Sequence, residues 1–179
     1  FASGAPIRAV GATRADPRSQ AILVRDGGPV RSLADLRGRK VAGNRGGWGQ
    51  FLIRAALKRE GIDPAAVEIV FLQPPEASLA FRSGAVDAWA IWEPFNAVEI
   101  QTFGARTLVD GTGLTPTISF TAANEAALRD RRPELADLLR RQRDGWNWAR
   151  NNISTYAQST SRLTRLPEPA VRRAYEVQQ

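Results

Sequence analysis

The chain has 179 residues and a hydrophobic content of 43%, enough for one ordinary domain or two small lobes, and no apolar run is long enough to span a membrane. Its formal net charge of +7 comes with no run of basic residues interleaved with aromatic ones, which argues against a nucleic-acid-binding protein. Without Cys or His it lacks thiol nucleophiles, His-dependent triads and ordinary Cys/His metal sites, so we expect no catalytic residue, no metal and no cofactor.

Short apolar runs alternate with helical patterns through the first two thirds of the chain. Such runs predict strands, and strands that alternate with helices are typical of a parallel α/β architecture. The predicted strands are Ile7 to Val10, Ala21 to Val24, Lys40 to Ala42, Val67 to Leu72, Val86 to Trp92, Arg106 to Val109 and Ile118 to Ala123.

Start and stop signals predict the helices between these strands. Ser32 can cap a helix over "SLADLR" that Gly38 ends, and Gly61, Gly84 and Gly104 end the next three helices.

From Asn124 onward the patterns are only helical. A long helix is predicted from Pro133 to Arg150, and Asn152 can cap the next one. The clusters Arg129 to Arg132 and Arg140 to Arg143 lie in this amphipathic region, and we interpret them mainly as solvated helix faces. One face of the long helix carries Leu135, Leu138, Leu139, Gln142 and Trp146.

The stretch from Asn44 to Gln50 places glycines between a strand and a helix. No Lys followed by Ser or Thr stands at the helix start, and Leu52 occupies the last Gly position of a dinucleotide-binding motif, so both nucleotide motifs are incomplete. Glycines can still turn backbone N–H groups toward a guest, and the helix N-terminus adds a partial positive charge. The loop is therefore a candidate site for a sulfonate, nitrate or carboxylate, with Trp48 as an apolar wall. The alternative is a plain strand-to-helix turn with a Trp in the core.

Two further loops, Gln73 to Ala77 and Trp92 to Phe95, also precede helices. Because ligands of open α/β sheets lie beyond the carboxyl ends of strands, we expect the three loops near one edge, with Trp48, Trp92 and Phe95 around a small pocket. Residues 89 and 92 differ by three and point to opposite faces of a strand, so we expect Trp89 in the core and Trp92 in the pocket. The candidate ligand-binding residues are Gly46, Gly47, Trp48, Gly49, Gln50, Pro75, Glu76, Trp92 and Glu93.

Three segments carry a family resemblance: "SLADLRGRKVAGNRGGWGQFLIRAALKREGID", "LQPPEASLAFRSGAVDAWAIWEPF" and "GARTLVDGTGL". Together they resemble the substrate-binding proteins of ABC importers for aliphatic sulfonates, taurine and nitrate, over nearly the whole chain. The stretch "G-x-V-D-A-W-x-I-W-E-P", Gly84 to Pro94, points to the sulfonate branch. The resemblance implies an α/β, two-lobed periplasmic binding protein fold of type II. Residues 1–21 would then be part of lobe I, residues 22–113 a complete lobe II, and residues 114–179 the mostly helical return to lobe I.

Both ends of the sequence lie inside a pattern. "FASGAPIRAV" begins in mid-pattern and "AYEVQQ" stops in mid-helix. We therefore expect a fragment that lacks the N-terminal part of one lobe and the C-terminal end. The resemblance implies that the full-length precursor carries a signal peptide and that the mature full-length protein is a monomer.

The function implied by the resemblance is that of a periplasmic solute-binding component, not an enzyme. It would capture an aliphatic sulfonate for sulfur acquisition and deliver it to the transmembrane permease subunits. The family often carries Ser or Thr where Gly46 to Gln50 stand here, which favours a bulkier or more apolar sulfonate over taurine or nitrate. Nitrate or taurine binding, an enzyme on the same scaffold (a sulfinate desulfinase or a pyrimidine-precursor synthase), and a sensory domain of a regulator remain alternatives.

Overall fold

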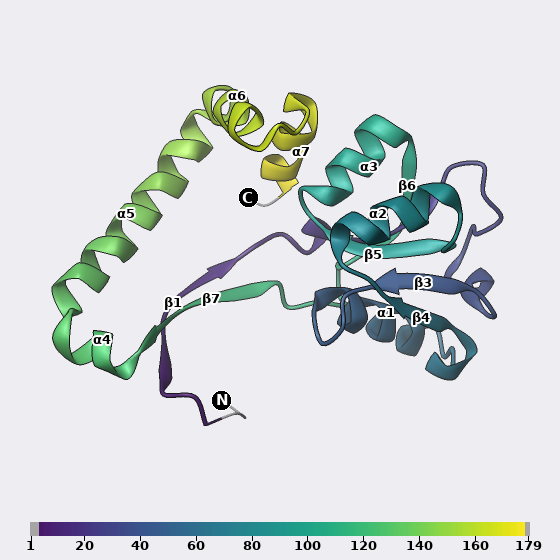
Figure 1. Cartoon of the computed structure of the whole chain (residues 1–179), viewed down its shortest axis with the longest axis horizontal. Helices are drawn as coiled ribbons and strands as arrows, with labels where there is room; N and C mark the ends of the chain where they lie inside the picture. The colour runs from purple at the N-terminus through teal and green to yellow at the C-terminus, as the bar shows by residue number, and fades with distance from the viewer. Residues whose placement is uncertain (1–3, 178–179) are drawn as a thin grey trace.

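The structure, a computed structural model, describes residues 4–177. A five-stranded sheet with helices on both faces occupies one side of the molecule (Figure 1). A two-stranded ribbon extends away from this sheet, and a long helix runs back beside the ribbon to two helices that return to the sheet. Within the described residues, none of the helices has the length and apolar character needed to cross a membrane.

The large sheet has the strand order β4-β3-β5-β2-β6. β3 pairs in parallel with β4 and β5, whereas β2 runs antiparallel to both β5 and β6. The predicted parallel sheet is therefore correct except for β2. The reason is that β2 begins beside the ends of its two neighbours: Gln20 lies opposite Trp92, and Ala21 opposite Asp110. The strands are β2 (Gln20–Arg25), β3 (Lys40–Gly43), β4 (Glu68–Phe71), β5 (Ala88–Trp92) and β6 (Ala105–Asp110).

Both faces of this sheet are covered, so its central strands are apolar on both sides. On β2, Ile22 and Val24 pack with Leu52 of α1, while Leu23 packs in a second core with Phe81 of α2. The helices around the sheet are α1 (Trp48–Arg59), α2 (Pro74–Ser83) and α3 (Phe95–Phe103), with single 3-10 turns at η1 (Pro17–Ser19), η2 (Leu33–Leu36) and η3 (Pro64–Ala66).

The predicted helix boundaries are mostly confirmed. The "SLADLR" segment forms only a 3-10 turn, whose capping box joins Ser32 and Asp35. Gly84 and Gly104 end α2 and α3 in the left-handed conformation that glycine adopts at low cost.

The two-stranded ribbon consists of β1 (Ile7–Arg14) and β7 (Ile118–Asn124), which pair antiparallel. The segments that join it to the sheet also bind each other. The N–H of Ala15 donates to the carbonyl of Thr117 at 3.0 Å, and the N–H of Gly111 donates to the carbonyl of Gln20 at 2.9 Å. The lobe boundaries at residues 21/22 and 113/114 stay a prediction.

Beyond β7 the chain is helical. α4 (Glu125–Asp130) is followed by α5 (Arg132–Asn151), α6 (Ile153–Thr164) and α7 (Glu168–Val177). The long predicted helix is thus confirmed to within about one residue at each end. α7 packs on α3 through small side chains, with Ala97, Ala170 and Ala174 in one buried cluster. The chain's last helix therefore returns to the large sheet.

Candidate ligand-binding site

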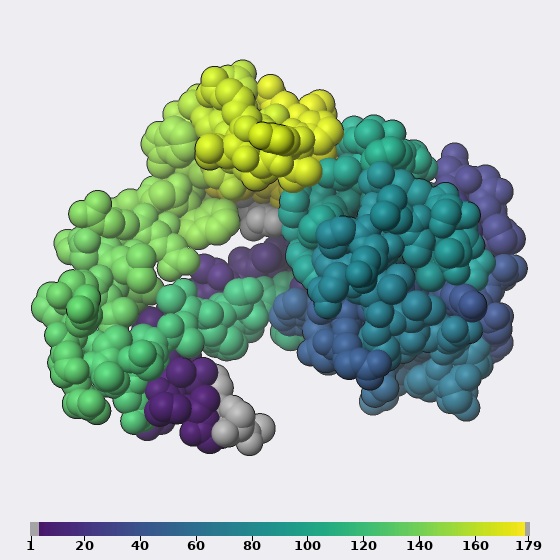
Figure 2. Space-filling view, in the orientation of Figure 1, coloured from purple at the N-terminus to yellow at the C-terminus, as the bar shows by residue number. Residues whose placement is uncertain are grey.

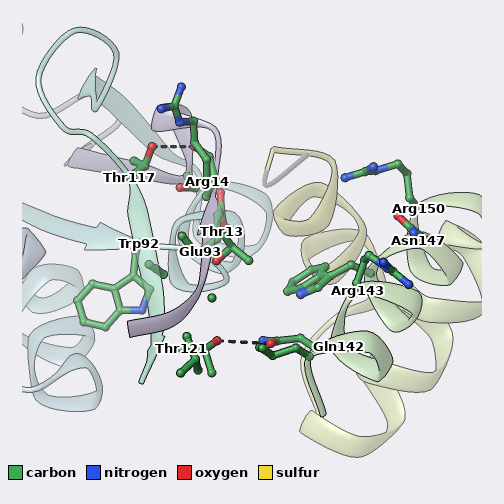
Figure 3. Close-up of a pocket in the computed structure, with 18 of the residues that line it drawn as sticks. Thr13, Arg14, Trp92, Glu93, Thr117, Thr121, Gln142, Arg143, Asn147 and Arg150 are labelled. Carbon is green, nitrogen blue, oxygen red and sulfur yellow. Dashed lines mark hydrogen bonds between the residues drawn. The ribbon is translucent and has the colours of Figure 1, made fainter. Parts of the chain in front are cut away.

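A cavity of about 1120 Å³ lies between the large sheet, the β1–β7 ribbon and α5. Figure 2 shows the hollow between α5 and the body that holds the sheet. Its wall on the sheet side is formed by the start of α1, the end of β5 and the η1–β2 junction. Figure 3 shows Trp92 and Glu93 on one side of it and α5 on the other. The cavity is therefore placed where the carboxyl ends of β3 and β5 meet helix starts, as expected for this type of sheet.

Three of the nine predicted ligand-binding residues line this cavity together: Trp48, Trp92 and Glu93. Gly46, Gly47, Gly49 and Gln50 belong to the same loop and helix start as Trp48 but are not among the lining residues. Pro75 and Glu76 are exposed in the first turn of α2 and do not line it either. Whether any of the nine binds a ligand stays a prediction.

The glycine loop uses part of its hydrogen-bonding capacity internally. The N–H of Gly46 donates to Oε1 of Gln50 at 2.8 Å, and the N–H of Gly49 donates to Oδ1 of Asn44 at 2.9 Å. The hydrogen bonds of α1 begin with the N–H of Phe51, which donates to the carbonyl of Gly47 at 3.1 Å. The N–H groups of Trp48 and Gln50 precede that bond in the first helical turn, where a helix has no carbonyl of its own to offer and where its partial positive charge lies.

The acidic residue in the first turn of α2, Glu76, takes part in capping that helix. Glu76 forms a capping box with Gln73, whose N–H donates to Oε2 of Glu76 at 3.3 Å. This reciprocal contact satisfies an amide at the helix start. It explains a carboxylate at this position without a ligand.

Trp89 and Trp92 lie in different environments, as their spacing predicts. Trp89 is 1% exposed and lies between Phe81 and Phe95, each at 6.2 Å between ring centroids. Trp92 lines the cavity and meets Phe95 edge-on at 6.2 Å. One indole therefore fills the core, while the other presents apolar surface to the cavity.

Glu93 is the buried carboxyl group of the site. It is 5% exposed, and its Oε2 accepts a hydrogen bond from the N–H of Ala97 at 2.9 Å. Burial raises the pKa of the Glu93 carboxyl to about 7, although the Ala97 hydrogen bond and the charge of Arg173 on α7 both act to lower it. Its backbone is fixed as well, because its N–H donates to the carbonyl of Ser19 at 2.9 Å. The cavity therefore contains a carboxyl group that changes charge near neutral pH.

The α5 wall was not predicted from the sequence. Arg140, Arg143, Asn147 and Arg150 follow one another at helical spacing and line the cavity. Figure 3 shows Arg143 and Arg150 on α5, across the cavity from Glu93. The spacing alone could have identified a continuous basic face, but not whether it met solvent or a cavity. The interpretation of Arg140 to Arg143 as mainly a solvated face is therefore incomplete: Arg140 and Arg143 are exposed and also line the cavity.

The β1–β7 ribbon contributes hydroxyl groups, which the glycine loop lacks. Thr13, Ser119 and Thr121 line the cavity, and Oγ1 of Thr121 lies 3.4 Å from Oε1 of Gln142 on α5. Trp146, which also lines the cavity, stacks on Tyr175 of α7 with the two ring planes 10° apart. The walls thus combine guanidinium and hydroxyl donors with the faces of three indoles, those of Trp48, Trp92 and Trp146.

Comparison with known proteins identifies the family of the chain. The family described as "NMT1/THI5 like" matches residues 1–153. The chain belongs to the NMT1/THI5-like family. A curated relative, the "Putative aliphatic sulfonates-binding protein" of Escherichia coli strain K12, is 38% identical over 122 residues, which are 68% of this chain and 38% of the relative. The chain therefore spans little more than a third of that relative's length.

Solved structures of other proteins share this fold. The alkanesulfonate-binding protein SsuA from Xanthomonas axonopodis pv. citri, bound to MOPS, superposes with a TM-score of 0.91 at 26% identity. That match covers 99% of this chain and 62% of the other. The prediction of an α/β periplasmic binding protein fold is thereby confirmed. The desulfurization enzyme DszB has a TM-score of 0.69 at 22% identity, covering 93% of this chain and 63% of the other, and shows a likeness of fold alone.

Proposed function

We propose that this chain forms part of the ligand site of a periplasmic solute-binding protein that captures organic sulfonates for an ABC importer. The observation that carries the proposal is the composition of the cavity. Arg140, Arg143 and Arg150 face a wall that presents Trp48 and Trp92, so an anionic head and an apolar body can be accommodated together. The relative from Escherichia coli is named for aliphatic sulfonates, and the Xanthomonas structure holds MOPS, itself a sulfonate.

The mechanism would be capture without chemistry. Hydrogen bonds from donors to a charged group contribute about 1.5–3 kcal/mol each, so a few of them suit micromolar affinity. On the α1 side, we assign the backbone N–H of Trp48, which lines the cavity in the first turn of the helix, as a donor to the sulfonate. Closure about the paired segments at Ala15 and Thr117 would bury the ligand and present a closed face to the permease.

An enzyme on the same scaffold is the second candidate, and only the fold likeness to DszB favours it. The chain contains no Cys or His, so a nucleophile of either kind would have to come from outside these 179 residues. We therefore propose a binding protein that is not an enzyme. Nitrate and taurine are less favoured ligands because the site presents large indole surfaces.

Titration calorimetry of the intact protein tests the proposal. Hexane-1-sulfonate should bind with micromolar affinity, while hexanoate of the same chain length binds more weakly. At a hundredfold excess over the dissociation constant, the sulfonate should raise the free energy of unfolding by about 2.7 kcal/mol. Absence of heat and of thermal stabilisation with every sulfonate tried would reject the binding function. Release of sulfite from an aromatic sulfinate would support the enzyme instead.

A further inference from the structure

A polar cluster converges on the carbonyl group of Ser19, at the edge of the cavity. The N–H of Glu93 donates to this carbonyl at 2.9 Å, and Nδ2 of Asn96 donates to it at 3.2 Å. Gln20, the next residue along the chain, lines the cavity beside Glu93. All three side chains are at most 6% exposed. Glu93 therefore stands among buried polar groups rather than in solvent.

Two acceptors of this cluster lack a donor. Oε1 of Gln20 and Oδ1 of Asn96 are buried and have no hydrogen-bond partner among the described residues. Glu93 receives a single side-chain hydrogen bond, that from Ala97, and forms no ion pair within residues 4–177, although the charge of Arg173 acts on it. A buried carboxylate is held in its charged form by several donors or a paired cation, and Glu93 has one donor and no paired cation. A proton on Glu93 would remove its charge and add a hydrogen-bond donor to this buried polar region.

An anionic ligand in the same cavity adds a second reason for that proton. A sulfonate beside an ionised carboxylate would place two negative charges within one poorly solvated space, which disfavours the ionised form of the carboxyl. The cations of the cavity lie mainly on the opposite wall, on α5. Glu93 and the α5 arginines therefore do not form the short ion pairs that would keep the carboxyl charged.

We propose that Glu93 is a neutral carboxylic acid when a sulfonate is bound, and that it selects anions by taking up a proton as they bind. This inference rests on the proposed function, because it concerns the same cavity. An ionised Glu93 would repel anions, whereas the neutral acid tolerates them and can donate a hydrogen bond. Since burial already raises the pKa of Glu93 to about 7, a nearby anionic ligand would shift the carboxyl toward its protonated form at neutral pH.

Other charged groups lie near Glu93 or face the same cavity and contribute to the electrostatic potential at its carboxyl. Arg173 on α7 acts to lower the pKa of Glu93, as a nearby cation does. On η1, Asp16 and Arg18 are paired with each other at 2.7 Å, so they offset one another. The remaining charged groups that face the cavity are Arg14 on β1 and Arg140, Arg143 and Arg150 on α5.

The test is a titration of the intact protein with hexane-1-sulfonate, an anion throughout the range, between pH 6 and pH 8. The dissociation constant should rise about tenfold over this range, because above a pKa of about 7 a proton must be gained before the ligand is accepted. Calorimetry in two buffers of different ionisation enthalpy should record uptake of close to one proton at pH 8. This second measurement needs no variant.

Glu93→Gln keeps an acceptor for the N–H of Ala97 but cannot ionise. Its affinity should be independent of pH and equal to that of the wild type at pH 6. Glu60→Gln, at an exposed position at the end of α1, is the matched control and should retain the wild-type pH dependence.

Binding without pH dependence or proton uptake overturns the inference and leaves the proposed function intact. Affinity that rises with pH also overturns it, because ligand binding would then be accompanied by loss of a proton and not by its uptake. Failure of any sulfonate to bind at any pH overturns the proposed function and this inference with it.

Discussion

The side chain of Asn44 occupies the space beside Gly47 in the loop that precedes α1. A Cβ atom at Gly47 would overlap the side-chain amide nitrogen, Nδ2, of Asn44. Asn44 is held there because its Oδ1 accepts the hydrogen bond from the N–H of Gly49. The glycine at position 47 is therefore required by a neighbouring side chain that caps the helix. This local demand exists whether or not the loop also binds an anion.

Gly47→Ala should destabilise the protein by roughly 0.5–2 kcal/mol, because the new methyl group displaces Asn44 and its cap is lost. Asn44→Ala should cost a similar amount, and the double variant little more than either, since both changes remove one interaction. Gly145→Ala is the control: it lies within α5 with open space around it and should stabilise by up to about 1 kcal/mol. Urea denaturation measures all four. Fully additive losses would show that Gly47 is required for another reason.

The two indoles of β5 should respond differently to truncation. Trp89→Ala should lower the free energy of unfolding by roughly 3–5 kcal/mol, because it empties a site packed between two Phe rings. Trp92→Ala should change stability much less and instead weaken sulfonate binding, because its ring faces the cavity. Chemical denaturation and calorimetry on the same two samples separate the effects. Unchanged affinity in Trp92→Ala would show that this indole is no part of the ligand contact.

Much of the fold follows from local patterns. All seven predicted strands and the long helix exist, because apolar periodicity and glycine stops are properties of neighbouring residues. The direction of β2 does not follow from such patterns. The apolar pattern of a strand does not indicate its direction in a sheet. β2 is antiparallel because its first residues pair with Trp92 and Asp110, at the ends of the neighbouring strands. That information lies in pairing between residues far apart in the sequence.

The sequence could likewise identify only some of the residues of the candidate site. Trp48, Trp92 and Glu93 could be identified because the carboxyl ends of strands meet at one edge of a sheet, a rule that needs only the strand order. The α5 arginines could not, because an exposed basic face is expected of any solvated helix. The β1–β7 ribbon leads the chain away from the sheet, and α5 therefore lies opposite the sheet, on the other side of the cavity (Figure 1). Only this path of the chain places the basic face beside the cavity.

The stability of the protein should fall between pH 5 and pH 8 through Glu93. Burial raises the pKa of Glu93 above its ordinary value of 4.5 to about 7, so the folded state holds this proton more tightly than the unfolded state. The resulting stabilisation is fully present below about pH 4.5 and is lost as the pH rises through 7. Its size is on the order of 3 kcal/mol at most.

Urea denaturation of the wild type and Glu93→Gln at several pH values checks this expectation. The difference in unfolding free energy between the two should change with pH in favour of the variant as the pH rises. Glu60→Gln, a change of the same kind at an exposed position, should follow the wild type. A difference that stays constant from pH 5 to pH 8 would mean that the Glu93 carboxyl does not titrate in this range.

The basic wall of α5 should contribute unequally to ligand affinity. Arg143 lies 3.2 Å from Asp144, so part of its charge is already compensated, whereas Arg150 forms no ion pair within residues 4–177. Arg150→Gln should therefore weaken sulfonate binding by about tenfold or more, the loss expected for one charged hydrogen bond. Arg143→Gln should weaken it by less than about fivefold, and this smaller loss should diminish in high salt, because it comes from screened attraction.

Arg141→Gln is the matched control on the same helix. Arg141 is exposed, pairs with Asp137, and is not among the cavity-lining residues. Its removal changes the net charge by the same amount as the other two substitutions, so it measures the effect of overall charge alone. Calorimetric titration with hexane-1-sulfonate at low and high salt compares the three variants. If Arg141→Gln loses as much affinity as Arg150→Gln, the α5 wall attracts anions only through the general charge of the protein, and the cavity-facing position of Arg150 has no bearing on recognition.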